Sequence, residues 1–271
     1  MSLATPKNTK LASWLRSSFR SSSPYKTFDV VDINEHRPLT IEVKSLLKTI
    51  IASALYDIDF LTIVAESLGW DTVQKMLTER RPKVKNLRYG DFGEIITNAI
   101  LADFFGYIIP VQKLRYRIET DQSLPGTDSI ALKVVSGAIT DVSFVESKLR
   151  SGQDTSKAVE GYHQLAADYV EDFFGFTTFV LSRMHEEKHQ LFSAFLAYLK
   201  DRKDTTNLES FRLGLVWEYG KWSETCLRNL EEARETAVPR MTVQLVRIQN
   251  LIPLIEELYG SLGITEITND G

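Results

Sequence analysis

Two charged residues at the end of an apolar segment are the strongest candidates for chemistry in this chain. Glu146 and Lys148 stand two apart at the end of residues 139–149, which the sequence predicts to form a strand. Side chains alternate between the two faces of a strand, so both should point to the same face. The preceding residues on that face, Val142 and Phe144, are apolar. The strand should therefore face the core and bring a carboxylate and an ammonium together at its end.

Asp128 adds a second carboxylate, just before a strand predicted over residues 129–135. Asp128 and Glu146 together offer the hard oxygen ligands that Mg²⁺ or Mn²⁺ binds, and the main-chain carbonyl of Ser147 can add a third. A metal there would neutralise phosphate charge and acidify a bound water. Lys148 would orient that water or stabilise charge on the phosphorus. The pattern indicates phosphodiester hydrolysis.

Each of these residues also has an ordinary structural explanation. Glu94 could hold a water or an outer metal, but with Asp91 it also fits a D-x-x-E capping box at the start of a helix. Asp128 fits a turn residue after Pro125 and Gly126. The pair at the end of the second strand fits a surface ion pair. A catalytic site is favoured because the four charged residues occur together, first on a helix, then at a turn and then at a strand end.

A basic cluster precedes the helix that carries Glu94. The net charge of −4 does not indicate a general nucleic-acid binder, but the charge is unevenly distributed. The cluster is predicted to bind DNA phosphates beside the chemistry. It consists of Arg80, Arg81, Lys83, Lys85 and Arg88.

The order of expected elements predicts an α/β fold with a mixed central sheet flanked by helices. Helices are expected at 40–56, 58–68, 71–79, 91–105, 155–172, 178–200, 222–236 and 251–262, and strands at 107–118, 129–135, 139–149, 211–219 and 241–249. We expect three parts: a basic flexible arm at 1–28, a helical N-terminal portion at 29–85 and a catalytic domain at 86–271. A polar arm explains the Ser-rich start better than an organellar transit peptide does, and that start lacks the apolar core of a secretory signal.

The motifs resemble a known nuclease superfamily. Gly-Glu at 93–94, Pro-Gly-Thr-Asp at 125–128 and Val-Glu-Ser-Lys at 145–148 resemble the PD-(D/E)xK pattern, whose α-β-β-β-α-β core matches the expected order over residues 90–220. Together with the start G-D-F-G-E and the strand end E-S-K-L, they more narrowly resemble HamA, the nuclease subunit of the bacterial Hachiman anti-phage system, over residues 60–260.

This resemblance implies a metal-dependent DNA endonuclease held in check by a partner helicase, HamB, which would sense aberrant DNA. By motif position, Asp128 and Glu146 would bind the metal, Lys148 would be the catalytic lysine and Glu94 an accessory acid. Some relatives carry a glutamine on the helix after the E-x-K strand. Gln153 and Gln164 both remain open for that position.

Two alternatives compete with a nuclease. The first is a catalytically silent nuclease fold that serves as a DNA-binding or partner-binding regulatory subunit. The second is a zinc protease, because His185, Glu186 and His189 fit H-E-x-x-H, with Glu209 as a possible third ligand. The intervening Glu-Lys pair indicates a solvated helix face, which disfavours zinc. His163, after the E-x-K strand, fits a packed helix better than a substrate groove.

Composition excludes other classes of protein. The single cysteine excludes a disulfide framework and cysteine-based metal sites, and fits a reducing compartment. No window approaches 18 uncharged apolar residues, so no membrane span is expected. We therefore expect a cytoplasmic protein with no membrane partner.

Overall fold

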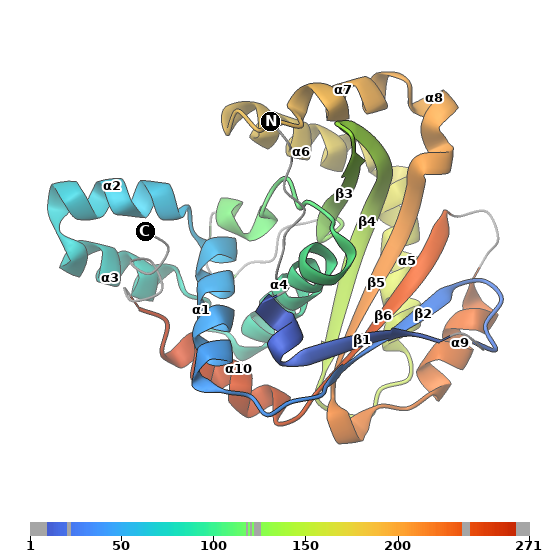
Figure 1. The fold of residues 1–271 in the computed structure, drawn as a ribbon, viewed down its shortest axis with the longest axis horizontal. Helices are drawn as coiled ribbons and strands as arrows, with labels where there is room; N and C mark the ends of the chain where they lie inside the picture. Colours follow the sequence, from blue (N-terminus) through green and yellow to red (C-terminus); the bar gives the residue numbers. More distant parts are fainter. Residues whose placement is uncertain are drawn as a thin grey trace.

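A six-stranded mixed sheet organises the molecule (Figure 1). The structure is a computed structural model and describes residues 10–20, 23–117, 119, 121, 126–234 and 239–263, without the side chains of Lys10 and Arg80. The strands are β1 (Leu15–Phe19), β2 (Asp29–Glu35), β3 (Ser129–Val135), β4 (Ala138–Arg150), β5 (Glu209–Glu218) and β6 (Arg240–Ile248), in the order β1-β2-β6-β5-β4-β3. The four inner strands are parallel, and β1 and β3 run antiparallel at the two edges. The predicted α/β fold is confirmed.

Helices cover both faces of this sheet (Figure 1). One face packs against α1 (Ile41–Leu55), α4 (Lys85–Phe105) and α10 (Leu251–Gly260). The other packs against α5 (Lys157–Glu171), α6 (Phe173–Glu186), α7 (Phe192–Lys200) and α9 (Thr225–Ala233). Along β5, Leu213 and Leu215 enter the second core while Val216 enters the first, as strand alternation requires. The helices α2 (Ile58–Leu68) and α3 (Trp70–Arg80) pack on each other, and α8 (Arg202–Thr205) follows α7.

The prediction of a flexible arm is wrong for residues 10–20, which contain regular structure. A short 3-10 helix, η1 (Lys10–Ser13), leads into β1, which pairs with β2 as an edge strand. Leu11, Trp14 and Leu15 are buried in the same core as α4 and α10. Burying these three apolar side chains favours an ordered segment despite the surrounding serines and basic residues.

The expected helical portion at 29–85 begins with a strand. Asp29–Glu35 forms β2, which lies between β1 and β6 in the sheet, and the helices follow only from Ile41. The expected boundary at 85/86 falls at the start of α4. Val31 precedes this boundary in the sequence and Ile255 follows it, and both belong to the same hydrophobic core.

Two expected elements are absent from the described residues. Over 107–117 the only strand-like pairing is a bridge between Ile108 and Leu132, and Lys113–Tyr116 forms a 3-10 helix, η2. The strand expected there is therefore wrong; its last residue, 118, lies outside the described residues. The single helix expected at 178–200 is two helices, because Lys188 adopts a left-handed φ of 52° between α6 and α7.

Candidate active site

Two glycines let helices approach β4 closely from both faces at the E-x-K positions. A Cβ added to Gly93 of α4 would lie 3.4 Å from the Ser147 Oγ, so α4 lies directly over this part of the strand. A Cβ added to Gly161 of α5 would lie 3.2 Å from the Lys148 Cγ on the opposite face. Because Glu94 follows Gly93, the close approach of α4 brings its carboxylate beside the strand end.

Asp128 lies where the neighbouring strand begins. The pairing of β3 with β4 starts with Ser129 opposite Val145, so the next stretch of β4 has no β3 residue beside it. The Asp128 Oδ2 accepts hydrogen bonds there from the Ser147 backbone N–H at 2.8 Å and from the Ser147 Oγ at 3.0 Å. Asp128 is therefore fixed against the E-x-K strand and is more than a turn residue.

Glu146 and Lys148 lie on one face of β4, as strand alternation predicts. The Lys148 Nζ donates to the Glu146 Oε1 at 2.5 Å. Glu146 is only 4 % exposed, and no described residue offers a hydrogen-bond partner to its buried second oxygen, Oε2. An unpaired carboxylate oxygen in a buried position is costly unless another group satisfies it.

Burial raises the pKa values of all three carboxyls, and the charge of Asp128 adds to the rise for the other two. Burial raises the pKa of Glu146 to about 8, and the charge of Asp128 adds to the rise. Burial also raises the pKa of Asp128 and takes that of Glu94 well above its ordinary value, again with a contribution from Asp128. A cation would reverse this effect because it favours the ionised forms. Carboxyls perturbed by burial and like charge in a cleft are typical of functional sites.

Two cations in this site escaped sequence reasoning. Lys113 and Arg117 belong to residues 107–118, which the sequence predicts to form a strand, and the sequence singles out neither as a site residue. The 3-10 turn directs Lys113 inward, and its Nζ donates to the carbonyls of Gly126 and Thr127 at 2.8 and 2.9 Å. Arg117 donates to both carboxylate oxygens of Asp91 at 2.8 and 2.6 Å.

The buried pair of Asp91 and Arg117 overturns the expected capping box. The helix α4 begins at Lys85, so Asp91 is an interior, buried residue of the helix and not its N-cap. Its carboxylate is occupied by Arg117. Glu94 is likewise interior to α4 and lies in the cavity, which removes the structural explanation that competed with a functional one.

These groups line one cavity of 550 Å³. It brings together the four predicted side chains, Asp128, Glu146, Lys148 and Glu94. Its walls include residues 86, 87 and 89–91 of α4 and residues 147–150 at the end of β4. Ser147 also lines it, with its N–H and hydroxyl used by Asp128. A role for its carbonyl as a metal ligand stays a prediction.

The oxygen donors of this cavity suit a magnesium ion that keeps several of its coordinated waters. In the described part of the chain, no group of three or more His, Cys, Asp or Glu side chains is placed to hold a metal ion by itself. Mg²⁺ commonly takes only one or two carboxylates and completes its octahedron with waters and substrate phosphates. The free buried oxygen of Glu146 and the crowded carboxylates fit that mode of binding.

Comparison with protein families gives a match over the same region. The sequence model of the HamA family matches residues 42–212, which is more than half of the chain and includes all four predicted catalytic residues. The chain belongs to the HamA family. It is accordingly a protein of Hachiman anti-phage defence. A search among curated proteins gives no match.

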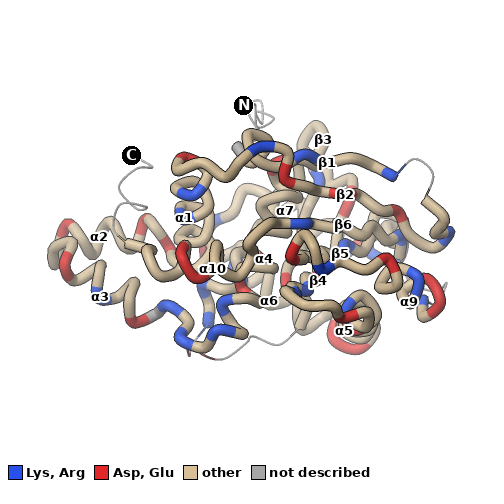
Figure 2. The backbone as a smooth tube through the Cα atoms, turned by 90° about the horizontal axis from the view of Figure 1, so that it is seen from below, with Lys and Arg blue, Asp and Glu red and all other residues tan. Residues whose placement is uncertain are grey.

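Only part of the predicted DNA-binding cluster of this HamA protein is exposed. Figure 2 shows the basic positions between α3 and α4. Arg81 donates to the carbonyl of Tyr259, and Arg88 pairs with Glu256 at 2.9 Å, so both arginines tie the cluster to α10. Lys83 and Lys85 are exposed. The side chain of the remaining member, at position 80, lies outside the described atoms, and DNA binding by the cluster stays a prediction.

The zinc-protease hypothesis fails on geometry. α6 ends at Glu186, and the left-handed residue that follows takes His189 off the helix. The His189 Nδ1 accepts from the Leu191 N–H at 3.1 Å, while the His185 ring packs against a phenylalanine. The suggested third ligand, Glu209, is buried and bound by Arg202 at 2.8 Å and by two tyrosines. The two histidines therefore do not form a helical pair.

The open glutamine and histidine positions do not contribute to the cavity as described. Gln153 is exposed in the loop after β4. Gln164 is exposed on α5 and donates to Asp168 at 2.9 Å. His163 is exposed beside Tyr162, which is the buried member of that pair. The described lining of the carboxylate cavity includes none of the three candidates.

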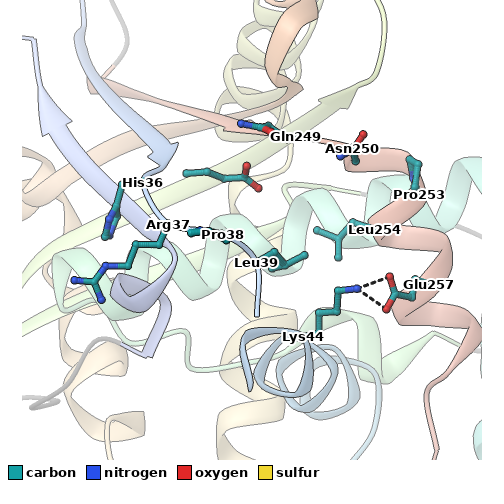
Figure 3. Close-up of a pocket in the computed structure, with 11 residues that line it drawn as sticks. His36, Arg37, Pro38, Leu39, Lys44, Gln249, Asn250, Pro253, Leu254 and Glu257 are labelled. Carbon is teal, nitrogen blue, oxygen red and sulfur yellow. Dashed lines mark hydrogen bonds and ion pairs between the residues drawn. The ribbon is translucent and has the colours of Figure 1, made fainter. Parts of the chain in front are cut away.

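A second cavity, of 790 Å³, lies on the α1 and α10 side (Figure 3). It is bounded by the loop after β2 and by residues 249–257. Two of the charged residues that line it form an ion pair, with the Lys44 Nζ 2.7 Å from both carboxylate oxygens of Glu257.

No described helix of the protein is long and apolar enough to cross a membrane.

Proposed function

We propose that this HamA protein is a metal-dependent DNA endonuclease that acts in anti-phage defence under the control of a helicase partner of the HamB type. One observation carries the proposal. The E-x-K strand end places Glu146 and Lys148 in the same buried cavity as Asp128 and Glu94. Burial raises the pKa values of the three carboxyls even though Lys113 opposes the rise in each of them.

The residues divide the work of hydrolysis. Asp128 and Glu146 would hold Mg²⁺ or Mn²⁺, which when bound supplies Lewis-acid stabilisation of the phosphate and a more acidic water. Glu94, whose carboxyl interacts with the charge of Asp128, would hold a water or strengthen the negative field. Lys148 lies half-buried at the strand end, where its ammonium can donate to a phosphate oxygen or orient the attacking water.

The substrate and partner follow from charge and family. Lys83 and Lys85 are exposed beside the α4 wall of the cavity, and Arg150 is 43 % exposed at the end of β4. Cations in these positions suit a polyanionic backbone that crosses the cavity mouth. DNA as the polyanion, and a helicase as the controlling partner, rest on the resemblance to Hachiman nucleases.

The test is cleavage of DNA with Mg²⁺ by the chain alone and with its helicase partner. Replacing Glu146 by Gln, Asp128 by Asn or Lys148 by Met should each lower the rate at least about a hundredfold. Glu257→Gln, the same change in the second cavity, is the matched control and should leave the rate unchanged. Chelation of the metal should abolish cutting by the wild type.

Two outcomes would contradict this function. Cleavage that survives the double variant Glu146→Gln, Lys148→Met would show that the site lies elsewhere. DNA or helicase binding by the wild type without cutting, under conditions where the partner is active, would favour the catalytically silent regulatory subunit.

A further inference from the structure

Lys113 is a buried cation of the cavity to which the proposed reaction gives no role. It is only 5 % exposed, and lysine is almost never buried unless its charge is paired. Its ammonium donates to two backbone carbonyls, those of Gly126 at 2.8 Å and Thr127 at 2.9 Å. Neither acceptor carries a full charge, so these bonds alone do not explain a buried cation.

The two carbonyls belong to the turn that delivers Asp128. Asp128 directly follows Thr127, and its carboxylate accepts from the Ser147 N–H at 2.8 Å. The backbone before Asp128 is therefore held by Lys113 from η2, and the side chain of Asp128 is held by β4. The hydrogen bond between Asp128 and Ser147 reports directly on whether the turn is in place.

The charge of Lys113 also acts on all three carboxyls. It opposes the rise in pKa of Glu94, Asp128 and Glu146, and Lys148 opposes it for Asp128 and Glu146. The aromatic face of Phe176 lies 5.4 Å from the Lys113 Nζ and favours a cation at that position. Lys113 is thus a buried cation that acts on the whole carboxylate group.

We propose that Lys113 is a positioning residue of the carboxylate site, which fixes the turn at 126–128 and provides the positive charge that keeps Asp128 beside Glu94 and Glu146 before a divalent cation binds. The inference rests on the proposed function in its last step alone, where Mg²⁺ joins Lys113 in compensating the carboxylates. In metal-free protein the positioning role stands on the hydrogen bonds of Lys113 and Asp128.

Three substitutions separate the two contributions of Lys113. Arginine keeps the charge and the donors, glutamine keeps donors without the charge, and methionine removes both. The measurement is hydrogen exchange of the Ser147 amide by NMR in metal-free protein. We expect exchange in Lys113→Arg to stay within about threefold of the wild type, and exchange in Lys113→Gln to be about tenfold faster and in Lys113→Met faster still. Lys133→Met, at an exposed lysine of β3, is the matched control and should change nothing.

Addition of saturating Mg²⁺ tests the role of charge. Mg²⁺ should slow Ser147 exchange in Lys113→Gln and Lys113→Met back toward the wild-type rate, because the divalent ion supplies the missing positive charge. A lysine that only fills space or braces a turn would give a defect that Mg²⁺ does not repair, and that result would overturn the role of charge.

The outcomes also separate this inference from the proposed function. Exchange in Lys113→Gln and Lys113→Met equal to the wild-type rate in metal-free solution would overturn the positioning role. If Lys113→Met does not fold, the comparison of arginine with glutamine decides the same question. Failure of the wild type to respond to Mg²⁺ at any amide would contradict the metal site, while the metal-free series would still decide the role of Lys113.

Discussion

The two cavities of this HamA protein hold similar residue types in opposite arrangements. In the larger one, of 790 Å³, Lys44 and Glu257 form an ion pair while remaining 31 % and 50 % exposed. In the smaller one, of 550 Å³, burial raises the pKa values of Glu94, Asp128 and Glu146, and the charge of Asp128 adds to the rise for the other two. Volume alone would select the larger cavity. Three buried carboxyls with raised pKa values select the smaller.

The difference has a physical meaning. Lys44 and Glu257 pair with each other and stay partly exposed to solvent, so keeping these two charges at the larger cavity costs the fold little. Carboxylates buried beside one another destabilise the folded state unless a cation joins them. A fold that retains such a group, with Gly93 and Gly161 allowing helices to close on both sides of it, carries a cost that only a function explains.

The largest effect on stability is expected at the buried pair that braces the smaller cavity. Arg117 and Asp91 form a bidentate pair with side chains only 8 % and 4 % exposed. Arg117→Met leaves the Asp91 carboxylate buried beside Glu94, so we expect the free energy of unfolding to fall by about 3–5 kcal/mol. Urea denaturation of metal-free protein measures this loss.

The double variant with Asp91→Asn is the matched control for that loss. Because it also removes the orphaned charge, it should recover a large part of the stability lost by Arg117→Met alone. Equal losses in the single and double variants would show that Arg117 acts through packing and not through its charge. An unpaired charge at the smaller cavity would then cost as little stability as one at the larger cavity.

A pH dependence of stability should come next in size. In the folded state the pKa of Glu146 is raised from its ordinary 4.5 to about 8. Between these values the folded chain holds a proton that the unfolded chain releases, so rising pH favours unfolding. The stability contributed by this proton is complete below pH 4.5 and is lost as the pH rises to about 8. Its slope reaches about 1.4 kcal/mol per pH unit for one proton.

The comparison of Glu146→Gln with wild type isolates that proton. Urea denaturation at pH 5, 6, 7 and 8 without divalent ions should give a shallower decline for the variant. Glu257→Gln, the same substitution at the exposed residue of the larger cavity, should follow the wild type. Parallel curves for all three proteins would mean that the environment of Glu146 does not differ from that of Glu257.

The sequence was most informative where one segment carried its own evidence. The strand end with Glu146 and Lys148 could be predicted because alternation along one strand is a local property. Asp128 could be predicted because a turn and a strand start follow directly from neighbouring residues. Glu94 could be proposed from its place near the start of the preceding helix, but its position beside the strand depends on the close packing permitted by Gly93.

Residues held by distant partners could not be predicted in this way. Lys113 and Arg117 read as one face of a strand, because nothing local shows that the segment turns and meets the 126–128 backbone and Asp91. Asp91 fits a helix cap by local rules, but a partner 26 residues away makes it a buried interior residue. The edge strand β1 likewise depends on burial of Trp14 and on pairing with β2, neither of which its own composition reveals.

The smallest effect should come from the ion pair of the larger cavity, and it completes the comparison. Lys44→Met combined with Glu257→Gln removes a partly exposed pair, which double-mutant measurements value at about 0.2–1 kcal/mol. Neither residue lines the carboxylate cavity, so the proposed metal-dependent cleavage should be unchanged in this variant. Urea denaturation and the DNA cleavage assay check the two statements on the same protein.

Salt distinguishes the two regions further. Raising the ionic strength screens exposed charges, so the contribution of Lys44 and Glu257 should shrink toward zero in high salt. The loss from Arg117→Met should persist, because its buried partner is poorly screened. A double variant of the larger cavity that lost several kcal/mol in high salt, or lost cleavage, would show that this cavity too is built around charge and would make it a second functional site.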